Sequence, residues 1–165
     1  MVAYLGLGSN VGDRLAQLRA AVDLLESSDD LRVVSRSSVY ETDPVGEVLE
    51  QRDFYNAVVL VETELGAHAL LDVCKRIERA LGRKPGRPRH GPRPIDVDLL
   101  IAGDLVIADD RLVLPHPELA NRRFVLTPLA ELDPGLALPD GRTVATALAA
   151  LEGQRVERVE QLGGS

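Results

Sequence analysis

The order of hydrophobic patterns along the chain predicts an α+β domain built on one antiparallel sheet. Strand-like runs occur at residues 2–8, 32–42, 56–64 and 95–101, and two helix-like repeats lie between them. The order strand, helix, strand, strand, helix, strand is the split βαβ, or ferredoxin-like, arrangement, which we expect to have its helices on one face. With 165 residues and 45% apolar content, the chain has the size of a single domain with its own core, over residues 1–165.

The first half of the chain contains three of the predicted strands and the first helix. The strand at 2–8 leads into residues 8–13, whose glycines and small polar residues favour a turn that ends at a helix cap. Leucine and valine then recur at helical spacing up to about residue 28. The segments 32–42 and 56–64 are rich in Val, Ser and Thr, as strands are.

The second half begins with a helix over residues 67–81, for which Gly82 is the stop signal. Residues 83–94 contain four prolines and two glycines, which exclude regular structure. A long irregular connection in a small domain is typical of a functional loop, so we expect a catalytic loop here. The remaining expected elements are a strand at 95–101, extended structure at 104–114, short helices after 117 and around 143–151, and a strand at 155–162.

The charge of the chain is unevenly distributed. The net charge is −7, which argues against general affinity for nucleic acid. Between Lys75 and Arg93, however, eight cationic side chains face a single carboxylate, Glu78. Such a segment is either a solvated loop or a binding site for a strongly anionic ligand.

The cysteine content and the N-terminal sequence bear on the cellular location. Cys74 is the only cysteine, so it forms no internal disulfide, which favours a reducing compartment and excludes a four-Cys zinc site. The first residues lack the basic region and apolar core of a signal peptide, and no apolar run approaches the ~20 residues that span a bilayer. We therefore expect a cytoplasmic protein without a membrane partner.

Two aspartates provide the clearest sign of chemistry. On the strand that begins at Ile95, Asp96 and Asp98 share a face because strand side chains alternate. Two adjacent carboxylates are favourable when a cation lies between them, and hard oxygen ligands of this kind suit Mg²⁺. The alternative is an exposed edge strand with two solvated aspartates. The arginine-rich loop directly before them favours the metal site, since cations and Mg²⁺ together are what phosphoryl chemistry needs.

A second polar segment follows at Pro115-His116, Asn121-Arg122 and Phe124. It combines a histidine, a cation and one of only five aromatic residues, as a site for a heteroaromatic ring and phosphates requires. The Walker-type phosphate loop is missing, and the glycines after the first strand do not match the dinucleotide-binding pattern. Any nucleotide must therefore be held by the loop at 83–94 and by the metal ions.

The sequence resembles the hydroxymethyldihydropterin pyrophosphokinase family over nearly its whole length. Five blocks carry the resemblance: Gly6-Leu7-Gly8-Ser9-Asn10, Tyr40-Glu41-Thr42 with Pro44, Asp53-Phe54-Tyr55-Asn56, Gly91-Pro92-Arg93-Pro94-Ile95-Asp96-Val97-Asp98, and Pro115-His116 with Asn121-Arg122 and Phe124. The resemblance implies a ferredoxin-like monomer that transfers a diphosphate from ATP to hydroxymethyl-dihydropterin, with AMP as the second product.

The resemblance also implies roles for individual residues. Asp96 and Asp98 would hold two Mg²⁺ ions, and Arg83 and Arg93 would act with them in catalysis. Phe54 and Phe124 would stack on the pterin, and Thr42, Pro44, Val45 and Asn56 would bind its polar edge. The residues implied at ATP are Glu78, Arg89, His90, Arg93, Leu99, Arg111, His116 and Arg122.

The sequence departs from the family pattern at His90, Pro85, Val113 and Pro117. These departures affect individual expected contacts with ATP and leave the expected reaction class unchanged. Arg87 is a candidate replacement for a missing loop cation. Two other readings of the same fold remain as alternatives. An RNA-binding module would need exposed aromatics on the sheet, and a small-ligand regulatory domain would leave the Asp96/Asp98 pair unexplained.

Overall fold

The structure is a computed structural model that describes residues 1–43, 53–82 and 94–162. The sheet strands are β1 (Val2–Ser9), β2 (Leu31–Arg36), β3 (Ser38–Thr42), β4 (Phe54–Thr63), β5 (Asp96–Ala102) and β8 (Val156–Gln161). The helices are α1 (Arg14–Glu26), α2 (Ala67–Ala80), α3 (Arg123–Leu132) and α4 (Val144–Ala149), with a short 3-10 turn, η1 (Leu119–Asn121), before α3. The short strands β6 (Ile107–Ala108) and β7 (Val113–Leu114) form a separate hairpin.

The main sheet is antiparallel, with the order β5-β1-β4-β3-β8, and β2 pairs with β4 beside β3. The single strand predicted at 32–42 is therefore two strands that both border β4. Ser37 separates them: its backbone N–H donates to the Val58 carbonyl at 2.9 Å, and its hydroxyl accepts from the Val58 N–H at 2.9 Å. A side chain thus replaces one rung of the backbone ladder, which explains the interruption.

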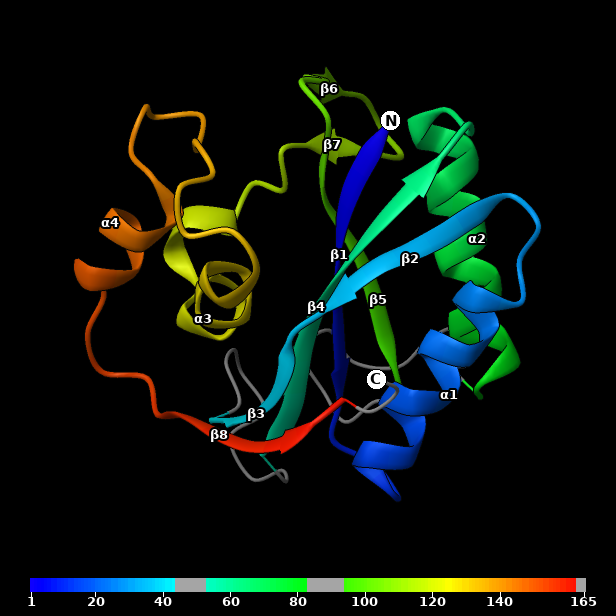
Figure 1. Cartoon of the computed structure of the whole chain (residues 1–165), viewed down its shortest axis with the longest axis horizontal. Helices are drawn as coiled ribbons and strands as arrows, with labels where there is room; N and C mark the ends of the chain where they lie inside the picture. The colour runs from blue at the N-terminus through cyan, green and yellow to red at the C-terminus, as the bar shows by residue number, and fades with distance from the viewer. Residues whose placement is uncertain (44–52, 83–93, 163–165) are drawn as a thin grey trace.

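Helices cover both faces of this sheet, as Figure 1 shows. Helices α1 and α2 lie on one face, where Leu18 and Leu70 belong to the same buried cluster as Leu5 of β1. Helices α3 and α4 lie on the other face, over a second cluster that contains Tyr4 and Val58. The expectation of helices on one face is therefore wrong, because α3 and α4 lie on the face opposite α1 and α2. The sheet is apolar on both sides, so both sides must be covered.

The predicted helix boundaries are confirmed by local geometry. Asp13 caps α1 by accepting from the Ala16 N–H at 3.1 Å. Gly12 before it has a φ of +67°, a left-handed conformation that glycine adopts without steric cost. Gly82 follows α2 with a φ of +100° and stops that helix.

The later elements agree with the predictions in type and differ in length. The extended segment expected at 104–114 forms only the two-residue strands β6 and β7. The expected last strand is β8, at one edge of the sheet beside β3. The predicted loop at 83–94 lies outside the described residues except for Pro94. Among the described helices, none has the length and apolar character needed to cross a membrane.

Candidate active site

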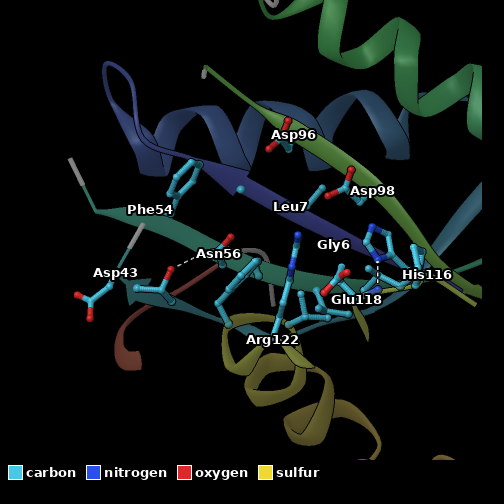
Figure 2. A pocket seen from close by; sticks show the side chains of 18 residues that line it. Gly6, Leu7, Asp43, Phe54, Asn56, Asp96, Asp98, His116, Glu118 and Arg122 are labelled. Atoms are coloured by element: carbon cyan, nitrogen blue, oxygen red, sulfur yellow. Dashed lines mark hydrogen bonds between the residues drawn. The ribbon is translucent and has the colours of Figure 1, made fainter. Parts of the chain in front are cut away.

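A cavity of about 370 Å³ opens on the face of the sheet that carries α3, near the start of that helix. Its walls come from β1, β3, β4, β5 and the segment that leads into α3. Figure 2 shows Asp96 and Asp98 along β5, with Phe54 and Asn56 on β4 at the other side of β1. The volume suits a small organic ligand. The cavity therefore gathers residues from distant parts of the chain.

Asp96 and Asp98 both line this cavity, as strand alternation predicts. Val97 between them is fully buried on the opposite face, with the core beneath α1 and α2. On β1, Gly8 is the register partner of Asp96 and Gly6 is the partner of Asp98. Because glycine has no side chain, the side chains of Leu100 and Asn56 can lie close to the β1 backbone at these two positions.

Asn56 and Thr42 form the polar wall of the cavity at the end of β3. The Asn56 side-chain amide donates a 2.6 Å hydrogen bond to the Thr42 hydroxyl, and both residues are buried. A β-carbon on Gly8 would lie 2.7 Å from the Asn56 Oδ1 atom, so only glycine leaves room for this carboxamide. The carboxamide is therefore fixed from both sides.

Aromatic side chains supply the apolar part of the cavity. Phe54 begins β4, and Phe124 lies in the first turn of α3. The guanidinium carbon of Arg122 lies 5.5 Å from the centroid of the Phe124 ring, within cation–π range. Flat apolar faces beside the Asn56–Thr42 pair match a flat heteroaromatic ring with a polar edge.

His116 occupies the rim of the cavity next to Glu118. Its backbone N–H donates to the Leu100 carbonyl at 2.8 Å, and its Nδ1 atom accepts from the Glu118 N–H at 3.1 Å. Burial, and then the positive charge of Arg122, hold the pKa of His116 below its ordinary value, while Glu118 acts in the other direction. The imidazole is therefore neutral at neutral pH, and the accepting Nδ1 atom leaves Nε2 to donate.

Three residues expected at the nucleotide lie away from the cavity. Leu99 is buried in the core on the opposite face, and the Glu78 carboxylate accepts from the Val97 N–H at 2.9 Å beneath β5. Arg111 forms an ion pair with Asp72 of α2. The cavity gives these three assignments no support. Six further expected residues, Pro44, Val45, Arg83, Arg89, His90 and Arg93, lie outside the described residues, as do Pro85 and Arg87.

Three of the lining residues that were not predicted as ligands lie close in sequence to predicted ones. Asp43 follows Thr42 directly, Glu118 follows His116 by two positions, and Val125 follows Phe124. Their only signal in the sequence is proximity to a motif. Of the positions where the chain departs from the family pattern, Pro117 lines the cavity, whereas Val113 lies exposed on β7.

The donor set of the cavity fits a magnesium ion better than a zinc ion. Within residues 1–43, 53–82 and 94–162, no group of three or more His, Cys, Asp or Glu side chains is arranged to hold a metal. Mg²⁺ needs no such group, because it binds through one or two carboxylates and completes its shell with phosphate oxygens and water. The pair Asp96 and Asp98 meets that requirement.

Solved structures define the class of this domain. Over 90% of its length, the chain matches the crystal structure of Plasmodium falciparum HPPK-DHPS A437G with SDX-DHP, with a TM-score of 0.71 and 16% identity. The match covers 45% of that chain, so this protein spans less than half of it. At such low identity, the likeness establishes a shared α+β fold.

Sequence comparison identifies the family. The model of 7,8-dihydro-6-hydroxymethylpterin-pyrophosphokinase (HPPK) matches residues 4–134. The 2-amino-4-hydroxy-6-hydroxymethyldihydropteridine pyrophosphokinase of Methylorubrum extorquens is 51% identical, over 96% of this chain and 98% of that protein. The protein of the same name from Pseudomonas aeruginosa is 40% identical, over 94% of this chain and 95% of that protein. The chain therefore belongs to the HPPK family.

Proposed function

We propose that this chain transfers a diphosphate from ATP to the hydroxymethyl group of 6-hydroxymethyl-7,8-dihydropterin, an early step of folate synthesis. The names of its family and of its relatives support this activity. The observation that carries the proposal is the single cavity that joins the Asn56–Thr42 wall to the two carboxylates of β5. A pterin ring held at one end would present its hydroxymethyl group to phosphates held at the other.

The pterin end consists of a polar edge and two apolar faces. Asn56 and Thr42 bind the hydrogen-bonding edge of the ring, and Phe54 and Phe124 stack on it, with Pro44 and Val45 as further expected ligands. Because the neighbouring Gly8 has no side chain, the Asn56 carboxamide can keep this position. A polar group that is already ordered loses little entropy when the ring binds.

The phosphate end consists of Asp96, Asp98, Arg122 and His116. The two carboxylates would hold two Mg²⁺ ions, which supply charge neutralisation for the transferring diphosphate. Arg122 donates to phosphate oxygens, and neutral His116 donates from Nε2. Arg83, Arg89, His90 and Arg93 complete this end, and catalysis proceeds by positioning and electrostatic stabilisation, without a covalent intermediate.

The finer description of the domain is also a proposal. The strand order β5-β1-β4, with β2 and β3 next in line, supports the ferredoxin-like split βαβ arrangement, because β4 lies between β1 and the strand that follows α1. We further propose that residues 1–165 form one domain with a catalytic loop at 83–94, and that the enzyme is a cytoplasmic monomer. The net charge of −7 supports the absence of a nucleic-acid partner.

An RNA-binding function receives no support from the described residues. Such a module stacks bases on aromatics of an open sheet face. Here Tyr4 and Tyr40 are buried, and helices cover both faces.

The test is the formation of AMP from ATP and Mg²⁺, with and without hydroxymethyl-dihydropterin. We expect pterin-dependent release of AMP and the pterin diphosphate, and at least a roughly hundredfold loss of turnover in Asp96→Asn and in Asp98→Asn. Asp140→Asn is the matched control, because Asp140 is exposed, pairs with Arg142 and lies outside the cavity lining. Release of ADP, or AMP release that does not depend on the pterin, would refute the proposal.

A further inference from the structure

The two residues directly before β8, Gln154 and Arg155, form hydrogen bonds with a residue of the cavity wall. Gln154 and Arg155 lie beyond residues 4–134, which match the family model, and neither lines the cavity. Both contact Asp43, which does line it and which follows directly on Thr42. The start of the C-terminal strand is thus connected to the pterin end of the cavity.

All four polar atoms of Asp43 engage this pair. Its backbone N–H donates to the Arg155 carbonyl at 3.3 Å, and its carbonyl accepts from the Gln154 Nε2 atom at 2.9 Å. Its carboxylate accepts from the Arg155 backbone N–H at 3.1 Å and from the Arg155 Nε atom at 3.3 Å. Every polar atom of Asp43 is therefore held by Gln154 or Arg155.

The same guanidinium group also joins the other strand of the wall. Arg155 forms an ion pair with Asp53, the residue before Phe54, through its Nη2 atom. Because Thr42 and Phe54 are register partners on β3 and β4, Asp43 and Asp53 lie at the ends of two paired strands. The Arg155 side chain thus holds together the ends of β3 and β4. These ends carry Thr42 and Phe54, the proposed polar and aromatic ligands of the pterin.

Charge explains why this position needs a cation. The Arg155 Nη1 atom lies 3.5 Å from a Glu41 carboxylate oxygen and 3.2 Å from a Glu157 oxygen, so four carboxylates surround one guanidinium group. Arg14 is the other cation described there, and it lies 3.1 Å from Glu41. Without Arg155, the carboxylates of Asp43 and Asp53 would repel each other and separate the two strand ends.

Gln154 extends the connection to α3. Its carbonyl accepts from the Arg123 Nη1 atom at 2.7 Å, and Arg123 lies between Arg122 and Phe124, which both line the cavity. The Gln154–Arg155 pair therefore links the wall formed by β3 and β4 to the start of α3.

We propose that Arg155, with Gln154, is a positioning residue for the pterin: it fixes Asp43 and Asp53, and through them the spacing of Thr42 and Phe54. This inference rests on the proposed pterin pyrophosphokinase activity. It differs from a general stabilising role because it predicts a selective effect. Binding of the pterin should weaken, while ATP binding and the chemical step, which depend on β5 and His116, stay intact.

The experiment compares the wild type, Arg155→Gln and Arg155→Lys, with Arg32→Gln as the matched control. Arg32 also pairs with a carboxylate across the sheet, but it is exposed at the other end of β4. The measurements are KM and kcat for each substrate, the Kd of hydroxymethyl-dihydropterin by calorimetry, and the melting temperature.

For Arg155→Gln we expect the KM and Kd of the pterin to rise roughly tenfold, with kcat and the KM of ATP within about twofold of the wild type. Arg155→Lys should recover part of the loss, because it restores the charge without the planar fork. Added salt should narrow the difference in pterin Kd between Arg155→Gln and the wild type by screening the partly exposed carboxylates. If Arg155→Gln fails to fold, Asp53→Asn carries the same expectation, because it weakens an ion pair of Arg155 at a residue outside the cavity lining.

The outcomes separate this inference from the function on which it rests. An active wild type with an unchanged pterin Kd in Arg155→Gln overturns the positioning role alone. If Arg155→Gln loses pterin affinity and ATP affinity equally, or loses kcat, the positioning role is also overturned. Such a result indicates that Arg155 has a merely structural role. A wild type that neither binds nor turns over the pterin overturns the proposed function, and this inference with it.

Discussion

The Asn56 carboxamide oxygen lies 2.7 Å from the position that a β-carbon on Gly8 would occupy. The two residues are register partners on β1 and β4, so neither can move away without breaking the sheet. The absence of a side chain at position 8 is thus a condition for the orientation of the amide at position 56.

Gly8→Ala should weaken pterin binding roughly tenfold or more, because the new methyl group displaces an amide that the Thr42 hydroxyl holds at 2.6 Å. Calorimetric titration with the pterin measures the effect. Gly135→Ala is the control, since a β-carbon there meets no atom within 4 Å. Equal affinities in the wild type and Gly8→Ala would show that the amide does not bind the ring.

Phe54→Ala and Phe124→Ala should each weaken pterin binding by about 1–3 kcal/mol, a typical contribution of one stacking contact to a heteroaromatic ring. The KM of ATP should change much less. Phe54→Tyr keeps the stacking face and serves as the control. A larger effect on ATP than on the pterin would place the nucleotide base at these rings and contradict the proposed orientation of the substrates.

Glu118→Gln should lower the KM of ATP roughly two- to fivefold at low ionic strength, because it removes a negative charge beside the expected phosphate site. The gain should shrink as salt is added. Glu64→Gln, an exposed change at the far end of β4, should leave the KM unchanged. A raised KM in Glu118→Gln would instead indicate that this carboxylate helps to hold the nucleotide.

Tyr40 should make the stability of the protein sensitive to alkaline pH. Burial, and then its 2.7 Å hydrogen bond to Glu131, raise the pKa of Tyr40 to about 12, and burial and Asp133 raise the pKa of Tyr4 to the same value. An unfolded tyrosine ionises near pH 10. Between about pH 10 and 12 the folded state thus binds more protons than the unfolded state, so the free energy of unfolding falls as pH rises.

Tyr40→Phe should lose about 2 kcal/mol of stability at neutral pH, because the hydrogen bond to a charged group is gone. It should also lose less stability than the wild type between about pH 8 and about pH 11. Urea unfolding at both pH values tests this, and tyrosinate absorbance offers a second readout, since the chain has no tryptophan. Identical pH dependence in the two proteins would contradict the assignment.

Local patterns were sufficient to predict most elements and part of the site. The side-chain alternation at 95–101 places Asp96 and Asp98 on one face, and the structure has them there. The second helical layer was not predicted, although the sequence contains a signal for it. The unbroken apolar run Ala57-Val58-Val59-Leu60-Val61 indicates a strand that is buried on both faces. The contacts of Gly8 with Asn56 and of Arg155 with Asp43 depend on strand register and tertiary pairing, which a single sequence does not specify.

The hydrogen bond between the Arg155 backbone and Asp43 joins residues 112 positions apart. Contacts of such long sequence separation form late, since the intervening chain must first be ordered. During synthesis, Thr42 and Phe54 leave the ribosome long before Arg155 does. If Arg155 positions Thr42 and Phe54 as proposed, the cavity reaches its final shape only when the last strand docks, and a nascent or C-terminally clipped chain has a sheet before it has a substrate site.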